Sequence, residues 1–192
     1  MASSGRNLAR DAADLAYRHV VDQARAPVFF TEYGVPDTLD GRFELICLHA
    51  FLYLHRLKSE RPRSSLLCQS FFDRMFADFD RSLREMGVGD LSVGKHVERM
   101  VRAFYGRILA YEAGLASDDT ALDAALVRNI FGTARNLSPV PAAMAGYVRR
   151  AITGLRSQPV ADLLAGRIFF EPPASLRPMA TASLPLGTDD ER

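Results

Sequence analysis

The stretch Gly-Val-Gly-Asp-Leu-Ser-Val-Gly-Lys-His-Val, residues 87–97, comes close to the phosphate-binding loop of nucleotide hydrolases. Gly89, Gly94 and Lys95 have the required spacing, but His96 occupies the place of the serine or threonine that holds magnesium. Such a loop also follows a strand, whereas residues 71–84 carry their apolar side chains at helical spacing. The sequence therefore argues against nucleotide hydrolysis.

A plainer interpretation of the same stretch is a joint between two helices. Gly87 would end the first helix in a left-handed conformation, and Asp90 or Ser92 would begin the second. Gly94 and Lys95 then fall in the first helical turn, where glycine lowers helix propensity and a cation faces the positive end of the dipole. Two unfavourable residues together indicate function. The structural alternative is an Asp90–Lys95 ion pair, with Gly94 allowing close helix packing.

The histidines and cysteines lack the spacing of a metal or haem site. His49 and His55 are six residues apart, which turns them about 120° from each other on one helix, so they cannot share a metal. Cys47 and Cys68 lie in apolar segments without a CxxC pattern, and we expect them to be reduced, buried thiols. No histidine belongs to a recognisable haem motif. We therefore expect no metal and no cofactor.

Three aspartates on one expected helix are the remaining catalytic candidates. Asp73, Asp78 and Asp80 could hold magnesium, as aspartate-rich helices do in prenyl-diphosphate enzymes, but those enzymes need a second such cluster on a facing helix. No second cluster occurs, and Asp80 is well placed to pair with Arg84 one turn later. Surface ion pairs are the simpler interpretation, and the sequence predicts a protein that is not an enzyme.

A basic stripe follows the glycine-rich joint. On a helix from about residue 92, one side is apolar, and the opposite side carries Lys95, Arg99 and Arg102 together with Gly106. A solvated helix face is one interpretation. The functional one is a surface for an anionic partner, which could be an acidic protein, ribosomal RNA or lipid headgroups.

Composition narrows the protein class. The chain has 192 residues, 48% of them hydrophobic, and a net charge of +1, which argues against sequence-specific nucleic-acid binding. No apolar run reaches the roughly 18 residues of a membrane-spanning helix. The N-terminal residues are not typical of a cleaved transit peptide, because acidic residues follow soon after the first arginines.

Periodicity predicts an all-α fold, a single-domain bundle of about six helices with at most a short extended C-terminal segment. The expected organisation is a flexible N-terminus over residues 1–7, a helical domain over 8–171 and a disordered, proline-rich tail over 172–192. The expected elements, by residue number, are helices over 7–25, 42–58, 65–86, 92–114, 118–134 and 139–155, a short helical turn after Pro159, and a strand or extended arm over 167–171.

Two blocks of sequence resemble the ubiquinol-cytochrome c chaperone family. The first is Asp-Thr-Leu-Asp-Gly-Arg-Phe-Glu-Leu, residues 37–45, with the apolar residues after it. The second runs from Met75 through Arg-Glu-Met-Gly-Val-Gly-Asp, residues 84–90, to Phe-Tyr-Gly-Arg, residues 104–107. The resemblance covers roughly residues 10–170. It implies a non-enzymatic assembly factor of complex III with newly made cytochrome b as client, helped by a small partner protein near the ribosome exit.

The resemblance, with the missing transit peptide, implies a bacterial protein at the cytoplasmic face of the inner membrane; the alternative is the matrix side of a mitochondrial inner membrane. A chaperone for a membrane protein would use an exposed apolar groove. The aromatic candidates for the groove are Phe29, Phe30, Tyr33, Phe51 and Tyr53. The expected anion-facing surface comprises Lys95, Arg99, Arg102 and Arg107, with Asp90 at the joint. Alternatives are an isoprenoid- or quinone-binding protein or enzyme and a ribosome- or RNA-binding adaptor.

Overall fold

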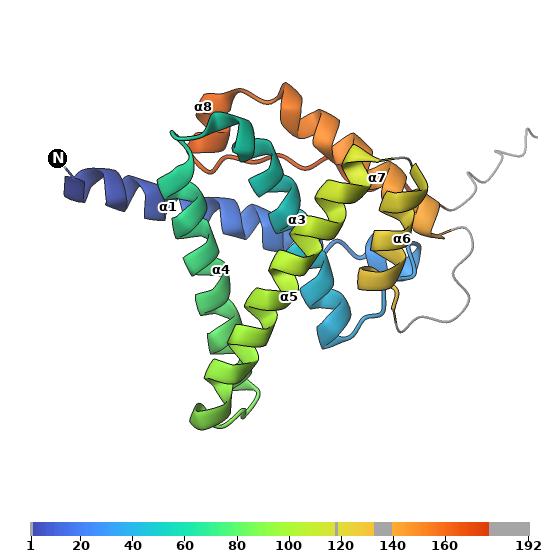
Figure 1. The fold of residues 1–192 in the computed structure, drawn as a ribbon, viewed down its shortest axis with the longest axis horizontal. Helices are drawn as coiled ribbons and strands as arrows, with labels where there is room; N and C mark the ends of the chain where they lie inside the picture. Colours follow the sequence, from blue (N-terminus) through green and yellow to red (C-terminus); the bar gives the residue numbers. More distant parts are fainter. Residues whose placement is uncertain (1, 118, 133–139, 177–192) are drawn as a thin grey trace, which may run out of the picture.

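The computed structural model describes residues 2–117, 119–132 and 140–176, and all regular structure within these ranges is helical (Figure 1). The predicted all-α, single-domain bundle is confirmed. Its longer helices are α1 (Ala2–Ala24), α3 (Leu39–Leu57), α4 (Ser65–Glu85), α5 (Asp90–Ala116), α6 (Asp119–Ile130) and α7 (Val140–Ser157). The short elements are α2 (Val28–Thr31), the 3-10 turn η1 (Lys58–Glu60) and α8 (Val160–Leu164).

Helix α3 lies at the centre of the bundle because its sequence is apolar on almost every side. It packs against α1, α5, α6 and α7, and nearly all its middle residues are buried. Thr38 starts the helix, since its Oγ1 accepts a hydrogen bond from the N–H of Gly41 at 3.2 Å. A side chain at Gly41 would collide with the carbonyl of Pro36, so the connector from α2 can cross α3 closely only at a glycine.

Helices α4 and α5 form a hairpin whose joint lies at the free end that projects from the bundle (Figure 1). Gly87 adopts a φ of 82°, and the N–H of Val88 donates to the Leu83 carbonyl at 3.0 Å. The N–H of Gly87 donates to the Arg84 carbonyl at 2.9 Å. This is the Schellman arrangement in which glycine favours the left-handed position, so the predicted helix-ending role of Gly87 is confirmed.

The segment after α8 is an extended arm rather than a strand. The side chain of Gln158 makes the two hydrogen bonds that a neighbouring strand would make. Its amide oxygen accepts from the N–H of Phe169, and its amide nitrogen donates to the carbonyl of the same residue. Ile168 and Phe170 point into the core. Gly166, with a φ of 78°, turns the chain where an added Cβ would lie 2.0 Å from the carbonyl oxygen of Ala12. The arm is thereby closely packed on α1.

Several boundaries differ from those expected. Helix α1 begins at Ala2 rather than Asn7, α3 begins at Leu39, and the connector after α1 contains the short helix α2. Residues 172–176 have no regular structure, and the rest of the expected proline-rich tail, 177–192, lies outside the described residues. In the described part of the chain, no helix combines the length and apolarity that crossing a bilayer requires.

Candidate functional site

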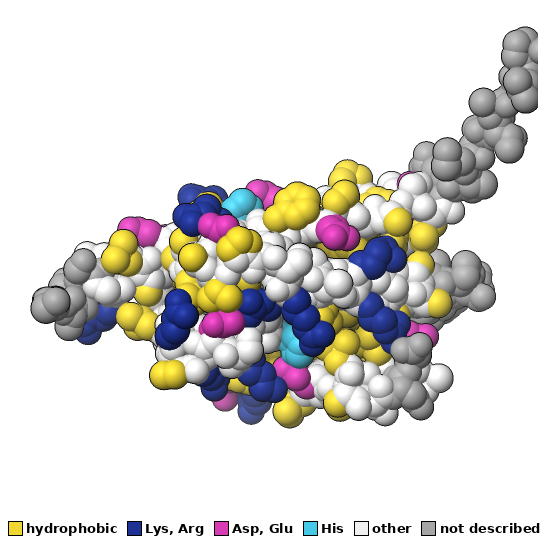
Figure 2. All heavy atoms as spheres, turned by 90° about the horizontal axis from the view of Figure 1, so that it is seen from above, with side chains coloured by type: hydrophobic (Ala, Val, Ile, Leu, Met, Phe, Trp, Pro, Cys, Tyr) yellow, Lys and Arg dark blue, Asp and Glu magenta, His cyan; other side chains and the backbone are white. Residues whose placement is uncertain are grey.

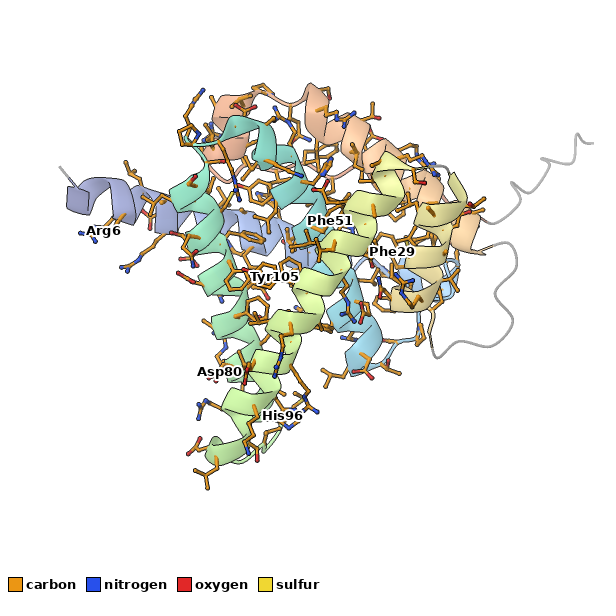
Figure 3. The ribbon with its side chains drawn as sticks, in the orientation of Figure 1. Arg6, Phe29, Phe51, Asp80, His96 and Tyr105 are labelled. Atoms are coloured by element: carbon orange, nitrogen blue, oxygen red, sulfur yellow. The ribbon has the colours of Figure 1, made fainter. Side chains whose placement is uncertain are left out.

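The aromatic residues expected to line an exposed groove are mostly core residues. Phe29, Tyr33, Phe51 and Tyr53 are fully buried, and only Phe30 is partly accessible, with the Arg42 guanidinium 5.8 Å from its ring centre. The expected exposure of those four side chains is wrong. Their rings instead fill the centre of the bundle, where Phe29 and Phe51 lie in Figure 3. The sequence shows that such residues are apolar but not which side of a crowded helix becomes accessible.

The buried aromatic cluster surrounds one histidine. His49 Nδ1 lies 2.7 Å from the Leu45 carbonyl, and Nε2 lies 2.8 Å from the Tyr147 hydroxyl. Because a carbonyl can only accept, Nδ1 carries the proton and Nε2 accepts from Tyr147. Gln23 in turn donates to the Tyr147 oxygen at 2.9 Å. Burial lowers the pKa of His49 to about 4, so the neutral ring is a structural part of the core.

An apolar groove does exist, but other residues form it. It lies where the ends of α1 and α3 face the free half of the α4–α5 hairpin, and its volume is about 600 Å³. Its apolar lining comes from Leu39, Phe43 and Ile46 of α3, Phe79, Leu83 and Met86 at the end of α4, and Met100 and Ala103 of α5. Leu39 and Met86 are at least half exposed, so the groove reaches solvent.

Charged side chains surround the groove. Arg25, Arg42 and Arg99 contribute positive charge, and Asp40 and Asp78 contribute negative charge. Asp78 is fully engaged, because it accepts from the Tyr17 hydroxyl at 3.0 Å and pairs with two arginines of α4. Arg42 pairs with Asp37 at 2.7 Å, and this carboxylate raises the pKa of the guanidinium. Among the described residues, no carboxylate pairs with Arg25 or Arg99. Asp40 is exposed and likewise has no ion-pair partner in the described ranges, so the free charges at the rim are those of Arg25, Arg99 and Asp40.

The predicted basic stripe is only partly on the surface. Lys95, Arg99 and Arg102 are exposed on α5, and Arg102 pairs with Glu98 at 3.3 Å. Arg107 does not join them, so its expected position facing a partner is wrong. Its guanidinium makes a bidentate ion pair with the buried Glu44 of α3. It also donates to the Ala103 carbonyl at 2.8 Å, which commits this side chain to holding α5 against α3.

The glycine-rich joint also differs from its structural interpretation. Asp90 pairs with Arg84 across the turn, not with Lys95. An added Cβ at Gly94 would meet nothing within 4 Å, so this glycine does not serve close helix packing. Asp90 and Lys95 are both exposed near the free end of the hairpin, close to the position of His96 in Figure 3. Neither helix packing nor an ion pair therefore explains the glycine and lysine at positions 94 and 95.

The aspartates of α4 form ion pairs and hydrogen bonds. Asp80 pairs with Arg84 at 2.7 Å, as expected, and Asp73 accepts from Gln69 at 2.8 Å. Over the described ranges, no three histidine, cysteine or carboxylate side chains come together in a way that could hold a metal ion. Both cysteines are free thiols; Cys47 is buried, as expected, whereas Cys68 is only half-buried. Burial raises the pKa of both thiols.

A second hollow, which sequence reasoning missed, lies at the other end of α3. It is lined by His55, Arg56, Lys58, Ser59, Glu60 and Arg156. Figure 2 looks onto this side of the molecule and shows several lysine and arginine side chains spread over it. Acidic neighbours neutralise part of its charge, since Arg56 pairs with Glu60 at 2.9 Å and Lys58 with Glu112 at 3.4 Å. The dense cationic run over residues 55–63 was the available signal.

Known proteins are similar to this chain in sequence and in fold. The profile of the family described as ubiquinol-cytochrome C chaperone matches residues 31–170. Ubiquinol-cytochrome c reductase complex assembly factor 1 from Homo sapiens is 31% identical over 165 residues, and that from Mus musculus is 30% identical over the same length. Each alignment covers 85% of this chain. The chain spans just over half of these relatives, 55% of the human and 56% of the mouse protein.

A solved structure supports the same assignment. The crystal structure of the Cbp3 homolog from Brucella abortus superimposes with a TM-score of 0.77 at 38% identity. The match covers 88% of this chain and 93% of that one. The family match spans both sequence blocks and includes the Glu44–Arg107 pair that joins them, and the fold agrees over nearly the whole chain. This chain therefore belongs to the ubiquinol-cytochrome C chaperone family.

Proposed function

We propose that this protein is an assembly chaperone for ubiquinol-cytochrome c reductase and that it holds an apolar segment of newly made cytochrome b in the α1–α3–α4–α5 groove. The family and the names of the relatives support the assembly role. The observation that carries the client site is an apolar groove that opens to solvent beside the buried core. Contiguous apolar surface that remains accessible on a folded protein is typical of a binding site.

The groove suits a segment of a membrane protein. Transmembrane helices present leucine, isoleucine and phenylalanine side chains, which need shielding from water before insertion. Leu39, Phe43 and Ile46 on one wall and Met100 on the other offer matching apolar surface. Arg25 and Arg99 at the rim favour a segment end with a carboxylate or the negative C-terminal end of a helix. The role is binding rather than catalysis.

Co-purification with a matched pair of variants tests the client site. Leu39 and Leu66 both lie in the first turn of a helix and are 59% and 45% exposed, but only Leu39 lines the groove. A glutamate is compatible with the first turn of either helix, so Leu39→Glu and Leu66→Glu should both fold. We expect Leu39→Glu to reduce capture of cytochrome b from detergent-solubilised membranes by about tenfold, because a carboxylate in the groove must be desolvated.

The outcomes separate the parts of the proposal. Capture by Leu66→Glu should equal that of the unmodified chain. If Leu39→Glu captures as much cytochrome b as Leu66→Glu, the groove is not the client site. If no cytochrome b co-purifies with the unmodified chain, the proposed client is wrong. Complex III activity after deletion of the gene for this chain then tests the assembly role alone.

A second candidate function rests on the size of the groove. A volume of about 600 Å³ with a mostly apolar lining is in the range of small-molecule sites, so an isoprenoid or quinone is the competing occupant. Mass spectrometry of an organic extract of the purified protein distinguishes the two. A quinone that is present in the unmodified chain and absent from Leu39→Glu would favour the small molecule.

The proposed location is the inner-membrane surface, at the cytoplasmic face in a bacterium or the matrix face in a mitochondrion. We also propose that the protein works with a small partner protein and near the ribosome exit. The cationic hollow at Lys58 and Arg156 offers a surface for an RNA-binding adaptor role. Binding to ribosomes that falls steeply as salt increases would support that role.

A further inference from the structure

The free end of the α4–α5 hairpin exposes an apolar side chain. Leu91 is 96% exposed, the highest value of any large hydrophobic residue in the described ranges, and Met86 across the turn is 50% exposed. Gly87 and Gly89 lie in the turn that separates Met86 from Leu91, and neither adds a side chain to it. Figures 1 and 3 show this end projecting from the body of the molecule, with nothing packed beside it. We call residues 86–99 the hairpin tip.

The tip also carries unpaired positive charge. Each acidic residue at or beside the tip pairs with an arginine, in the pairs Glu85–Arg81, Asp90–Arg84 and Glu98–Arg102. Arg81 and Arg84 are shared with Asp78 and Asp80 of α4. Lys95 and Arg99 have no carboxylate partner in the part of the chain that the structure describes. Lys95 follows Leu91 by four residues and therefore lies on the same face of α5. Lys95 thus lies directly beside the exposed leucine, and Arg99 lies about one turn further along α5.

We propose that the hairpin tip binds an anionic lipid bilayer, with Leu91 inserted among the headgroups and Lys95 and Arg99 on lipid phosphates. The shape of the tip favours a bilayer over a protein, because a stable protein interface buries roughly 1,200–2,000 Å² and a two-helix turn offers far less. A bilayer surface accepts a single apolar side chain and attracts cations within a Debye length. This arrangement gives a role to Lys95, which lies in the second turn of α5 because the helix begins at Asp90.

The position of the tip links the membrane contact to the groove. Met86, His96 and Arg99 belong to the tip and also line the groove, so the groove runs toward this end of the hairpin. A tip resting on the bilayer would place the groove where an apolar segment enters or leaves the membrane. The membrane contact goes beyond the proposed client binding and depends on different side chains, chiefly Leu91 and Lys95.

A tryptophan reporter tests the contact directly, because the chain has no tryptophan of its own. Leu91→Trp places the reporter at the tip. Leu109→Trp places it at another exposed position of the same helix, 71% accessible and about 27 Å further along. With vesicles of phosphatidylcholine and phosphatidylglycerol, we expect a blue-shifted emission and quenching by a lipid-borne quencher for Leu91→Trp only. Raising the salt concentration should weaken the response.

A second measurement examines the cations. The double variant Lys95→Glu/Arg99→Glu should lose at least about tenfold in vesicle affinity by flotation, since each cation near an anionic surface contributes to binding. The proposal is overturned if neither tryptophan responds, if both respond alike, or if the double variant binds vesicles as tightly as the unmodified chain. Capture of cytochrome b in detergent by Leu91→Ser should be unchanged, so failure of the membrane contact and failure of the client site are separate results.

Discussion

At the scale of single residues, two buried polar contacts define the interior of this bundle. The Glu44–Arg107 pair joins residues 63 positions apart and lies under the Phe43 ring, whose centre is 5.4 Å from the guanidinium carbon. It unites the Gly-Arg-Phe-Glu and Phe-Tyr-Gly-Arg blocks on which the family resemblance rests. Arg107 lies about 120° around α5 from Lys95, beside the apolar side of the helix, so grouping it with the exposed basic stripe was wrong.

The other buried contact, at His49, predicts a dependence of stability on pH. Folding lowers the pKa of His49 from its ordinary 6.5 to about 4, so the unfolded chain binds more protons between these values. The free energy of unfolding must therefore fall as the pH drops through this window. We expect a loss of about 2 kcal/mol between pH 7 and pH 5, measured by urea denaturation. His49→Gln keeps the other histidines and should remove this part of the dependence; an unchanged slope would contradict the assignment.

At the scale of elements, helical periodicity predicted α4 and α5 to within two residues, because their apolar sides repeat at helical spacing. The groove could not be predicted in the same way. Phe43 and Ile46, which line it, and Phe51, which is buried, carry the same apolar signal on α3. Which of them remains accessible depends on how the α4–α5 hairpin is angled away from α1 and α3, and that angle is set by contacts distant in sequence.

Two glycines of α5 allow the packing of one element pair to be tested. A Cβ at Gly114 would lie 2.8 Å from the Leu122 Cα, whereas a Cβ at Gly106 would meet nothing within 4 Å. Gly114→Ala should therefore push α6 away from α5 and lower the free energy of unfolding by about 1–3 kcal/mol. Gly106→Ala should raise it by up to about 1 kcal/mol through helix propensity. Urea midpoints that move in the same direction for both variants would refute close α5–α6 packing at Gly114.

At the scale of the whole molecule, the C-terminal arm closes the bundle over its N-terminal helix. The Glu171 carbonyl accepts from Gln23 of α1 at 3.1 Å, and the Phe170 ring stands 5.3 Å from His49, edge to face. The arm therefore completes the core around the hydrogen bonds of His49. The sequence predicted a strand or an extended arm for this segment. The α4–α5 tip, in contrast, extends away from this closed region (Figure 1).

Adjacent phenylalanines in the arm show how much this closure contributes. Phe170 is 6% exposed and Phe169 is 65% exposed, although both belong to the same extended segment. Phe170→Ala should lower the free energy of unfolding by about 3–5 kcal/mol, because it leaves a cavity in the core. Phe169→Ala should change it by less than about 0.5 kcal/mol. Thermal or urea unfolding that ranks the two variants equally would mean that the arm does not close the core in solution, and the shape of the molecule would then be set by α1 to α7 alone.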